Sequence, residues 1–582
     1  MPANPSSEAA SGSTSGSNSG ALTGAHVLAQ TLQRLGVVEV FTIAGDHVLP
    51  LLDVMADGPF RFIDTRHESA AAHMADAFCR ISGRPGVVIS TTPGFANVVP
   101  ALANALHAEA PMLSISGSAP LSHLGRGAMQ EIDQVGMARP VTKLSVMVTD
   151  PLRIPDTVAH ALRVALSGRR GPVHLTVPVD VQQAQVNASD LDYLPLAPPP
   201  ATRANQTGVR QAVELIAKAQ RSVAIAGSAA AYGRSGEALA RFAEVTRTPV
   251  MTEGDARGLI PDDHPWCGGF YDLGLNRAAK LVPEADLVVL VGRRQDLTMG
   301  YALPPTIGAS AKIIQIDPDA GEIGRNRPVD VGLLGDVDTV LGQLADEASG
   351  LASESSTASF KPDRSEWLER MAVERREMDA WLQSLDEDTV PMHAMSIFKE
   401  LRPLLSNGDG VTFEGGDFCH FGRAYLSAYS PLSRLYFSTF GMLGASMGTV
   451  FAMKLARPES KAVLVTGDGA FGFNAMELDT AVRHNIPITV IVGNDAAWGI
   501  DRQIQLGAYG RVVATDLLPT RYDLVAQGLG AEGIHVTRRD ELGPALKSAL
   551  ASVRPTVVNV DISRTASPRG EMAIERWKAG GN

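Results

Sequence analysis

The stretch AVLVTGDGAFGFNAMELDTAVRHNIPITVIVGNDAAWG, residues 462–499, decides the fold of its part of the chain. It starts with an apolar strand pattern, AVLVTG, and contains a second one, ITVIVG, with the helical pattern AMELDTAVRH between them. Two such strands joined by a helix run parallel and end at the same edge of a sheet. We therefore predict a strand–helix–strand unit over these residues.

A carboxylate follows each of the two predicted strands. Asp468 lies in Gly467-Asp468-Gly469, and Asp495 follows Asn494. Because ligands of open α/β sheets bind at the carboxyl ends of strands, we expect the two acids to face one site. Such oxygen ligands bind Mg²⁺ or Ca²⁺ together with a diphosphate, while glycines and a helix N-terminus bring N–H groups to the phosphates. A GDG turn alone is common, so the prediction depends on the whole unit.

Strand and helix patterns alternate along the rest of the chain. Strand patterns such as GVVIST, SVAIAG and LVVLVG alternate with helical patterns such as ESAAAHMADAFCRISG. The fold class that we predict is α/β, with three doubly wound parallel-sheet domains. Pro-rich and low-complexity stretches separate the predicted parts. These are a disordered tail over 1–23, domains over 24–195, 205–345 and 365–562, and a basic C-terminal tail over 563–582.

The composition is ordinary for a soluble α/β protein and limits its partners. The 582 residues carry a formal net charge of −12, which argues against broad nucleic-acid binding. No apolar run reaches the roughly 18 residues of a membrane span, and the N-terminus lacks the features of a secretion signal. Cys79, Cys267 and Cys419 form no CxxC pair. We therefore expect a cytoplasmic protein without disulfides.

The GDG unit, with a polar residue 27 positions after its aspartate, resembles the thiamine-diphosphate motif. In that family the residues at 468 and 495 bind the metal by their side chains, and residue 497 binds it by its carbonyl. Ala497 suits a carbonyl ligand, and Asp495 stands where the family most often has Asn. The resemblance covers about residues 24–562 and implies thiamine diphosphate, Mg²⁺, and pyrimidine-binding, central and diphosphate-binding domains. It also implies cofactor contacts at Gly467, Asp468, Gly469, Ala470 and Asp495.

The resemblance also assigns residues outside this unit. Thiamine chemistry needs a carboxylic acid beside the aminopyrimidine ring, and Glu68 stands in that place after the strand pattern FRFIDTR. The family's Gly-x-x-Asn turn corresponds to Gly94 and Asn97, and Leu443 to the bulky residue that bends the cofactor. The alternatives are a helix N-terminal acid for Glu68 and a core leucine for Leu443. The family's cofactor lies between two subunits, so the resemblance implies a homodimer or homotetramer.

Three positions indicate which branch of the family the chain resembles. The stretch 125–143 resembles acetolactate synthases and acyl-CoA lyases, which makes Gln130 a residue that faces the substrate. GNDAAWGIDRQIQ resembles acetolactate-synthase-like 2-hydroxyacyl-CoA lyases, in which an acid at the place of Asp501 handles the substrate hydroxyl proton. His47 resembles an active-site histidine of benzaldehyde lyase and would relay protons. The alternative roles are a polar loop residue for Gln130, a surface acid paired with Arg502 for Asp501, and a capping histidine for His47.

Basic residues raise the question of a nucleotide-containing ligand. In relatives, the central domain holds FAD or the ADP part of coenzyme A, and the sequence leaves the two open. Arginines able to bind phosphates there are Arg293, Arg294 and Arg325. The C-terminal tail resembles the basic lid of relatives that use acyl-CoA, and a solvated tail is the alternative. Its basic residues are Arg564, Arg569, Arg576 and Lys578, the last two on either side of Trp577 on a predicted short helix.

These observations predict an enzyme that breaks or forms a carbon–carbon bond of a small molecule with thiamine diphosphate and Mg²⁺. The first hypothesis is a 2-hydroxyacyl-CoA lyase that releases formyl-CoA and a ketone or aldehyde. The second is an acetolactate-synthase-like or benzaldehyde-lyase-like carboligase acting on 2-oxo acids or aldehydes. The third is a non-catalytic thiamine-fold regulator, against which the intact Glu68, Asp468 and Asp495 count.

Overall fold

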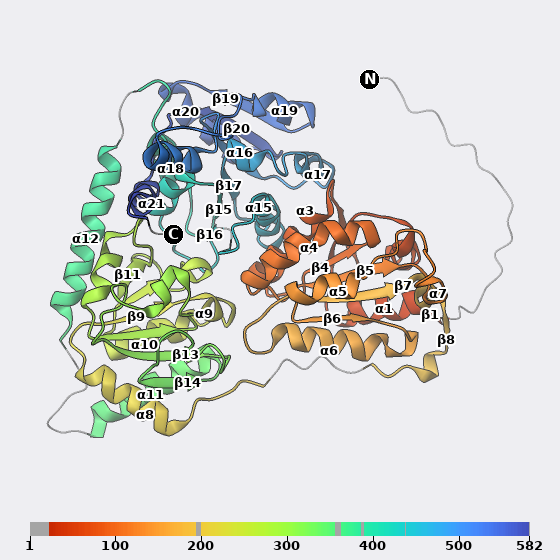
Figure 1. Cartoon of the computed structure of the whole chain (residues 1–582), viewed down its shortest axis with the longest axis horizontal. Coiled ribbons are helices and arrows are strands. Elements are labelled where there is room, and N and C mark those ends of the chain that lie inside the picture. The colour runs from red at the N-terminus through yellow and green to blue at the C-terminus, as the bar shows by residue number, and fades with distance from the viewer. Residues whose placement is uncertain (1–21, 194–199, 355–362, 386–388, 437, 581–582) are drawn as a thin grey trace.

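Three parallel sheets of six strands each form the framework of the computed structural model, which describes residues 22–193, 200–354, 363–385, 389–436 and 438–580. Helices flank each sheet, and the three layered units form separate lobes in Figure 1. The first lobe is coloured red to orange, the second yellow to green and the third cyan to blue. The predicted α/β class with three parallel-sheet domains is confirmed.

The first sheet has the strand order β3-β2-β4-β5-β7-β6. Its strands are β2 (Glu39–Thr42), β3 (Arg61–Asp64), β4 (Val87–Ser90), β5 (Leu113–Ser118), β6 (Leu144–Met147) and β7 (Val173–Pro178). The helices around it are α1 (Gly24–Arg34), α2 (Leu49–Ala56), α3 (Glu68–Ser82), α4 (Thr92–His107), α5 (Gln134–Ala138), α6 (Ile154–Leu166) and α7 (Val179–Gln183). Beside it, β1 (Leu22–Thr23) pairs antiparallel with β8 (Gln185–Val186). Leu22 and Thr23 are therefore structured, unlike the tail predicted over 1–23, whose remaining residues lie outside the described ones.

The second sheet has the order β11-β10-β9-β12-β13-β14. Its strands are β9 (Ser222–Ala226), β10 (Val250–Thr252), β11 (Cys267–Phe270), β12 (Leu287–Val291), β13 (Lys312–Asp317) and β14 (Val331–Leu334). The helices are α8 (Gln206–Lys218), α9 (Ser228–Tyr232), α10 (Gly236–Thr246) and α11 (Val337–Glu354). Helix α11 thus extends beyond the boundary predicted at residue 345. Helix α12 (Ser365–Ser384) runs along the edge of the molecule from this lobe toward the third (Figure 1).

The third sheet has the order β16-β15-β17-β18-β20-β19. Its strands are β15 (Gly410–Glu414), β16 (Arg434–Tyr436), β17 (Ala462–Gly467), β18 (Thr489–Asn494), β19 (Glu532–Val536) and β20 (Thr556–Asp561). The first helices are α13 (Met395–Leu401), α14 (Asp417–Tyr425), α15 (Ala445–Ala456), α16 (Asp468–Phe471) and α17 (Glu477–Arg483). They are followed by α18 (Gly499–Tyr509), α19 (Tyr522–Gly528), α20 (Arg539–Ala551) and α21 (Pro568–Lys578). The predicted strand–helix–strand unit is present as β17, α17 and β18.

Helix α3 shows how the local sequence sets an element's bounds. The His67 side chain accepts a hydrogen bond from the backbone N–H of Ser69 and so caps the first turn. Glu68 follows as the first helical residue, where a negative charge is favourable. The helix ends at Gly83, whose positive φ of 72° is the common conformation after a helix. Glu68 is thereby fixed at the edge of the first sheet.

Helix α4 begins earlier than the sequence pattern indicates. Its first residue is Thr92, whereas the apolar pattern predicts a helix only from Val98. Pro93 lies in the first turn, where its fixed φ suits a helix and its missing N–H costs nothing. Gly94 and Asn97 therefore lie on a helix, and the predicted Gly-x-x-Asn turn is wrong.

The first and third lobes meet along α3 and α15, which lie side by side in Figure 1. Glu477, at the start of α17, strengthens this contact by accepting hydrogen bonds from the backbone N–H groups of Arg66 and His67 at 3.0–3.2 Å. Arg483 adds an ion pair to Asp64 at 2.5 Å. The connection between β3 and Glu68 is thus anchored on the third lobe of the same chain.

Two findings concern the part of the chain that the structure describes. Cys79, Cys267 and Cys419 are buried and free. Among the helices described, none has the length and the apolar character that crossing a lipid bilayer requires.

Candidate active site

A cavity of about 250 Å³ lies at the carboxyl ends of β17 and β18. Gly467 and Gly493 are paired in the parallel register of these strands, so the residues that follow them are brought together. This is the position at which open α/β sheets bind ligands. Predicted site residues that line the cavity are Leu443, Gly467, Asp468, Gly469, Ala470, Asp495, Ala497 and Asp501.

Asp468 and Asp495 form a buried carboxylate pair in this cavity. The two carboxyl groups lie within hydrogen-bonding reach of each other. Burial raises the pKa of both, and the charge of Asp495 raises that of Asp468 further. Asp468 Oδ2 is buried and has no hydrogen-bond partner among the described residues. A divalent cation would give this oxygen a partner and balance the two charges, so the pair fits a metal site.

Asp468, Asp495 and Ala497 fit a metal ion that also takes ligands from a bound diphosphate. Within the described part of the chain, no three His, Cys, Asp or Glu side chains gather as a metal-binding group. At the ends of β17 and β18 the cavity presents the Asp468–Asp495 pair and the backbone of Ala497. Mg²⁺ is commonly bound by one or two carboxylates together with phosphate oxygens and water. The residues present therefore fit a magnesium diphosphate.

Glu414 holds the loop that carries Leu443. It ends β15 and accepts hydrogen bonds from the backbone N–H groups of Gly444 and Ser446, while the Asn474 amide donates to the Gly444 carbonyl at 2.9 Å. Burial raises the pKa of Glu414 to about 7. This residue was not predicted, although a glutamate at the end of a wholly buried strand was a signal in the sequence.

Glu68, Gly94 and Asn97 form a second group, in the first lobe. The Asn97 amide donates to Glu68 Oε2 at 3.0 Å. A Cβ atom on Gly94 would lie 2.8 Å from Glu68 Oε1, so a larger residue would displace the carboxyl group. The sequence-predicted pyrimidine residues are thus brought together, as the resemblance implies.

His47 belongs to a buried polar network beside this group. Its Nδ1 lies 3.1 Å from the Thr92 hydroxyl, and the Gln134 amide donates to the same hydroxyl at 2.8 Å. Burial lowers the pKa of His47, which favours the neutral form of the ring. Gln134 was missed because nothing in the sequence distinguishes it from its neighbour in the motif, Gln130.

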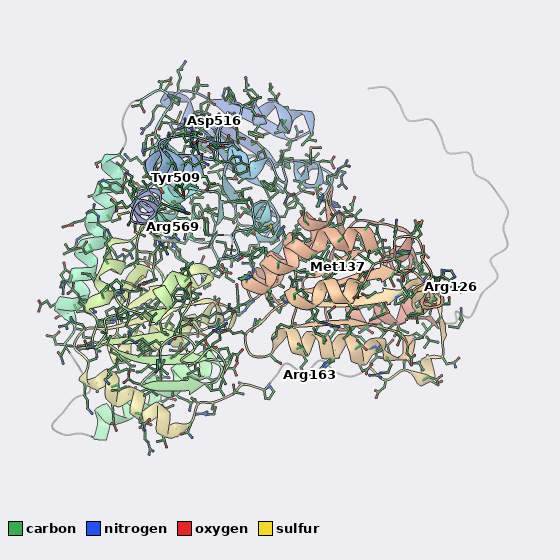
Figure 2. The ribbon with its side chains drawn as sticks, viewed as in Figure 1. Arg126, Met137, Arg163, Tyr509, Asp516 and Arg569 are labelled. Carbon is green, nitrogen blue, oxygen red and sulfur yellow. The ribbon has the colours of Figure 1, made fainter. Side chains whose placement is uncertain are left out.

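Gln130 is not among the residues that line the cavity at the ends of β17 and β18. Its side chain is exposed, and its φ of 59° places it at a tight point of the loop before α5. In Figure 2, Arg126 and Met137 mark this segment on the first lobe, away from Tyr509 and Asp516 on the third. A substrate contact of Gln130 stays a prediction.

Two further acids line the cavity beside the carboxylate pair. Asp501, in the first turn of α18, has a pKa raised by partial burial. Asp417, in the first turn of α14, has a pKa raised to about 6 by burial and was not predicted. The cavity thus offers further protonatable carboxyls beside the Asp468–Asp495 pair.

The cavity and the Glu68 group do not meet within one chain. Among the residues that the structure describes, those lining the cavity all fall between Ala394 and Thr565. Glu68 lies in the first lobe, outside this set. A single chain therefore presents the two halves of the predicted cofactor site separately.

The predicted phosphate-binding arginines of the central lobe are engaged with protein carboxylates. Arg293 is 4% exposed and bonds both oxygens of Asp296 at 2.8 Å. Arg294 pairs with Glu109 at 2.8 Å, and Arg325 pairs with Glu322 at the same distance. Their charges are already balanced, so this arrangement gives no support to phosphate binding by the three side chains.

Family models match all three lobes. Residues 22–137 match the N-terminal TPP binding domain of thiamine pyrophosphate enzymes, residues 209–344 match the central domain, and residues 414–560 match the C-terminal TPP binding domain. The chain belongs to the thiamine pyrophosphate enzymes. The Asp468–Asp495 pair and the Glu68 group lie in the two matched TPP-binding domains.

Similar proteins narrow the group within the family. The acetolactate synthase large subunit IlvG of Mycobacterium tuberculosis is 35% identical over 544 residues, which cover 92% of this chain and 94% of that protein. The 2-hydroxyacyl-CoA lyase of Arabidopsis thaliana is 30% identical over 560 residues (92% and 95%). The oxalyl-CoA decarboxylase of Escherichia coli is 30% identical over 558 residues (93% and 95%). The chain is thus a thiamine-diphosphate-dependent enzyme of this group.

Proposed function

We propose that this enzyme is a thiamine-diphosphate- and Mg²⁺-dependent 2-hydroxyacyl-CoA lyase that releases formyl-CoA and a ketone or aldehyde. The observation that carries the proposal is Asp501, whose carboxyl group lines the same cavity as Asp468 and Asp495. Cleavage next to a 2-hydroxyl requires a base that removes the hydroxyl proton. Partial burial raises the pKa of Asp501, which makes its carboxylate a stronger base.

The other roles are assigned to residues of this chain. Thiamine diphosphate, when bound, supplies a nucleophilic carbon and accepts the electron pair of the breaking bond. Asp468, Asp495 and the Ala497 carbonyl would hold Mg²⁺, and Gly467, Gly469 and Ala470 would face the diphosphate. Leu443 would support the bend of the cofactor from the cavity wall.

The first lobe would supply the residues around the pyrimidine ring. Glu68 would hold a proton on the ring nitrogen, with Asn97 orienting its carboxyl group and Gly94 leaving room for the ring. His47, neutral and buried, would relay a proton to the substrate oxygen.

We further propose that two chains share each cofactor site, in a homodimer or homotetramer. The cavity is lined from the third lobe, whereas Glu68 belongs to the first. A second chain that presents its first lobe to the cavity would unite the two groups. Two-fold symmetry would then create two equal sites.

The second candidate is an acetolactate-synthase-like carboligase acting on 2-oxo acids. The observation that favours it is the 35% identity to an acetolactate synthase large subunit. The central arginines are paired with protein carboxylates, and the contacts of the C-terminal tail described below engage further basic residues. The acyl-CoA lyase hypothesis is therefore left without a dedicated cluster of residues to bind the phosphates of coenzyme A. The residue roles given above apply to both reactions.

Product analysis separates the two candidates. Purified enzyme with thiamine diphosphate and Mg²⁺ is mixed with a short branched 2-hydroxyacyl-CoA, and in parallel with pyruvate, and products are identified by mass spectrometry. Formyl-CoA with a ketone or aldehyde supports the lyase. Acetolactate or CO₂ from pyruvate, with the thioester intact, supports the carboligase and overturns the lyase. No product from either mixture would count against both candidates.

The role of Asp501 is tested in the same assay. Asp501→Asn should lower kcat for the cleaved substrate about 10²–10⁴-fold, since a positioned general base contributes that much. Glu575→Gln, which alters an exposed acid on α21, is the matched control. An unchanged kcat in Asp501→Asn would show that Asp501 is not the base, and the lyase proposal would lose its main support.

A further inference from the structure

The C-terminal segment contacts the turn that carries Asp495. Arg564 Nε donates to the Asp495 carbonyl at 2.7 Å, and Nη2 donates to the Ala496 carbonyl at 2.8 Å. Its Nη1 lies 3.3 Å from Asp516, which also pairs with Arg502 at 2.8 Å. The rigid guanidinium therefore binds two consecutive carbonyls of the turn and is itself held by an acid.

The turn needs such support because of its backbone conformation. Ala496 has a φ of 52°, in the left-handed region that is unfavourable for a residue with a Cβ atom. Its neighbours Asp495 and Ala497 both line the cavity. A turn that relaxed toward an ordinary φ would redirect both groups.

We propose that Arg564 is a positioning residue for metal binding: it holds the Asp495–Ala497 turn in the conformation that presents its oxygens to the cation. This inference deepens the proposed function and rests on the metal role given there to Asp495. Arg564 itself touches neither metal nor substrate. Residues that orient metal ligands in this way usually affect metal affinity strongly.

The rest of the segment fixes the position of Arg564. Just after it, the Ser567 N–H and hydroxyl donate to Asp417 Oδ1 at 2.9 and 2.6 Å. A Cβ atom on Gly570 would lie 2.2 Å from the same oxygen, so only glycine allows this approach. Arg569 bonds Asp272 of the central lobe at 2.5 Å. The segment is therefore fastened to two lobes.

Helix α21 adds an apolar contact with α18. The rings of Tyr509 and Trp577 meet edge to face with centroids 6.3 Å apart. Ile574 packs closely against Gly507. Figure 2 labels Tyr509 and Arg569 in this part of the molecule, with Asp516 above them. Within its described residues, the predicted basic tail thus contains the packed helix α21, and Arg564 before the helix and Arg569 on it are committed to protein contacts.

The test compares Arg564→Ala, Arg564→Lys and wild type in the full-length protein with saturating thiamine diphosphate. Free Mn²⁺, used as the probe, is followed by electron paramagnetic resonance. We expect both variants to bind Mn²⁺ about 10–100-fold more weakly. Lysine keeps the charge but cannot make both carbonyl contacts. If Arg564→Ala lowers the melting temperature, Arg564→Lys still tests the role of the two contacts. Lys578→Ala, at the exposed end of α21, is the control.

Two results would overturn the inference. An unchanged Mn²⁺ affinity in Arg564→Ala would show that the turn holds its shape without the guanidinium. Full affinity in Arg564→Lys would show that charge, rather than geometry, is what Arg564 supplies. Failure of the wild-type protein to bind Mn²⁺ at all would contradict the proposed metal role of Asp495, and so concerns the proposed function itself.

Discussion

At the scale of single residues, the cavity is dominated by two carboxyl groups that repel each other. Asp468 is 2% exposed, and one of its oxygens has no partner among the described residues. A divalent cation between the two charges, as proposed above, would offset the cost of burying them. The chemistry of the site thus follows from a local electrostatic imbalance.

The role of Glu68 leads to a prediction that needs no substrate. Glu68→Gln should retain thiamine diphosphate but slow exchange of the cofactor's C2 proton with deuterium about 10²–10⁴-fold, because the amide cannot hold the ring proton. Exchange is measured by quenched-flow NMR of the bound cofactor. Glu575→Gln should exchange like wild type, and an unaffected rate in Glu68→Gln would assign the proton transfer to another group.

Residues at strand ends could be predicted from the sequence, and residues that act through distant partners could not. Asp468 and Asp495 each follow an apolar strand, so their place was evident. Gln134 and Arg564 act through hydrogen bonds to groups 42 and 69 residues away along the chain. No local pattern encodes such a pairing.

At the scale of elements, the packing of α3 on α15 joins the Glu68 segment to the third lobe. His73, on α3, is buried against Gly448 of α15, and its Nδ1 has no hydrogen-bond partner among the described residues. Burial lowers the pKa of His73 to about 3. The ring stays neutral in the folded protein at pH values where an exposed histidine is charged.

This buried histidine predicts a loss of stability in acid. The folded-state pKa lies below the usual 6.5, so the unfolded chain binds the proton first, and stability falls as the pH drops from 6.5 toward 3. The slope is about 1.4 kcal/mol per pH unit for one such group. His73→Leu should therefore show a flatter decline in melting temperature between about pH 6.5 and pH 5.

The control for this experiment is His160→Gln, which alters an exposed histidine of α6. Its pH dependence should match that of wild type. His174, which burial also keeps at a pKa of about 3, remains in every variant, so the decline should be reduced in His73→Leu and not abolished. An identical decline in wild type and His73→Leu would contradict the burial argument.

Most elements follow from the apolar patterns, and the exceptions have local causes. The strands β12 and β18 are buried throughout and read as continuous apolar runs, which is typical of parallel sheets. Helix α4 began earlier than predicted because a proline in the first turn favours a helix start rather than a break. Helix α11 continued into a stretch whose composition indicated a linker.

At the scale of the whole molecule, the two halves of the predicted site belong to different lobes. This arrangement predicts complementation between two inactive variants, Glu68→Gln and Asp468→Asn. If each site combines lobes of two chains, a mixed dimer has one intact site, and equal mixing restores about a quarter of wild-type C2 exchange. The variants are mixed after reversible dissociation or by co-expression with different tags.

Absence of restored exchange in verified mixed dimers would mean that one chain supplies both groups.

The number of lobes was predictable because each one repeats the alternation of strands and helices. How the lobes and the C-terminal segment meet was not, since contacts such as Arg569 with Asp272 join residues from different domains.

The most direct test of the account is a titration of thiamine diphosphate into the purified protein, with and without Mg²⁺. Trp498 lines the cavity and reports binding by its fluorescence. We predict saturable, Mg²⁺-dependent binding to wild type that is about 10–100-fold weaker in Asp468→Asn. Equally tight binding in Asp468→Asn, or binding indifferent to Mg²⁺, would contradict the assignment of the carboxylate pair as the metal and diphosphate site.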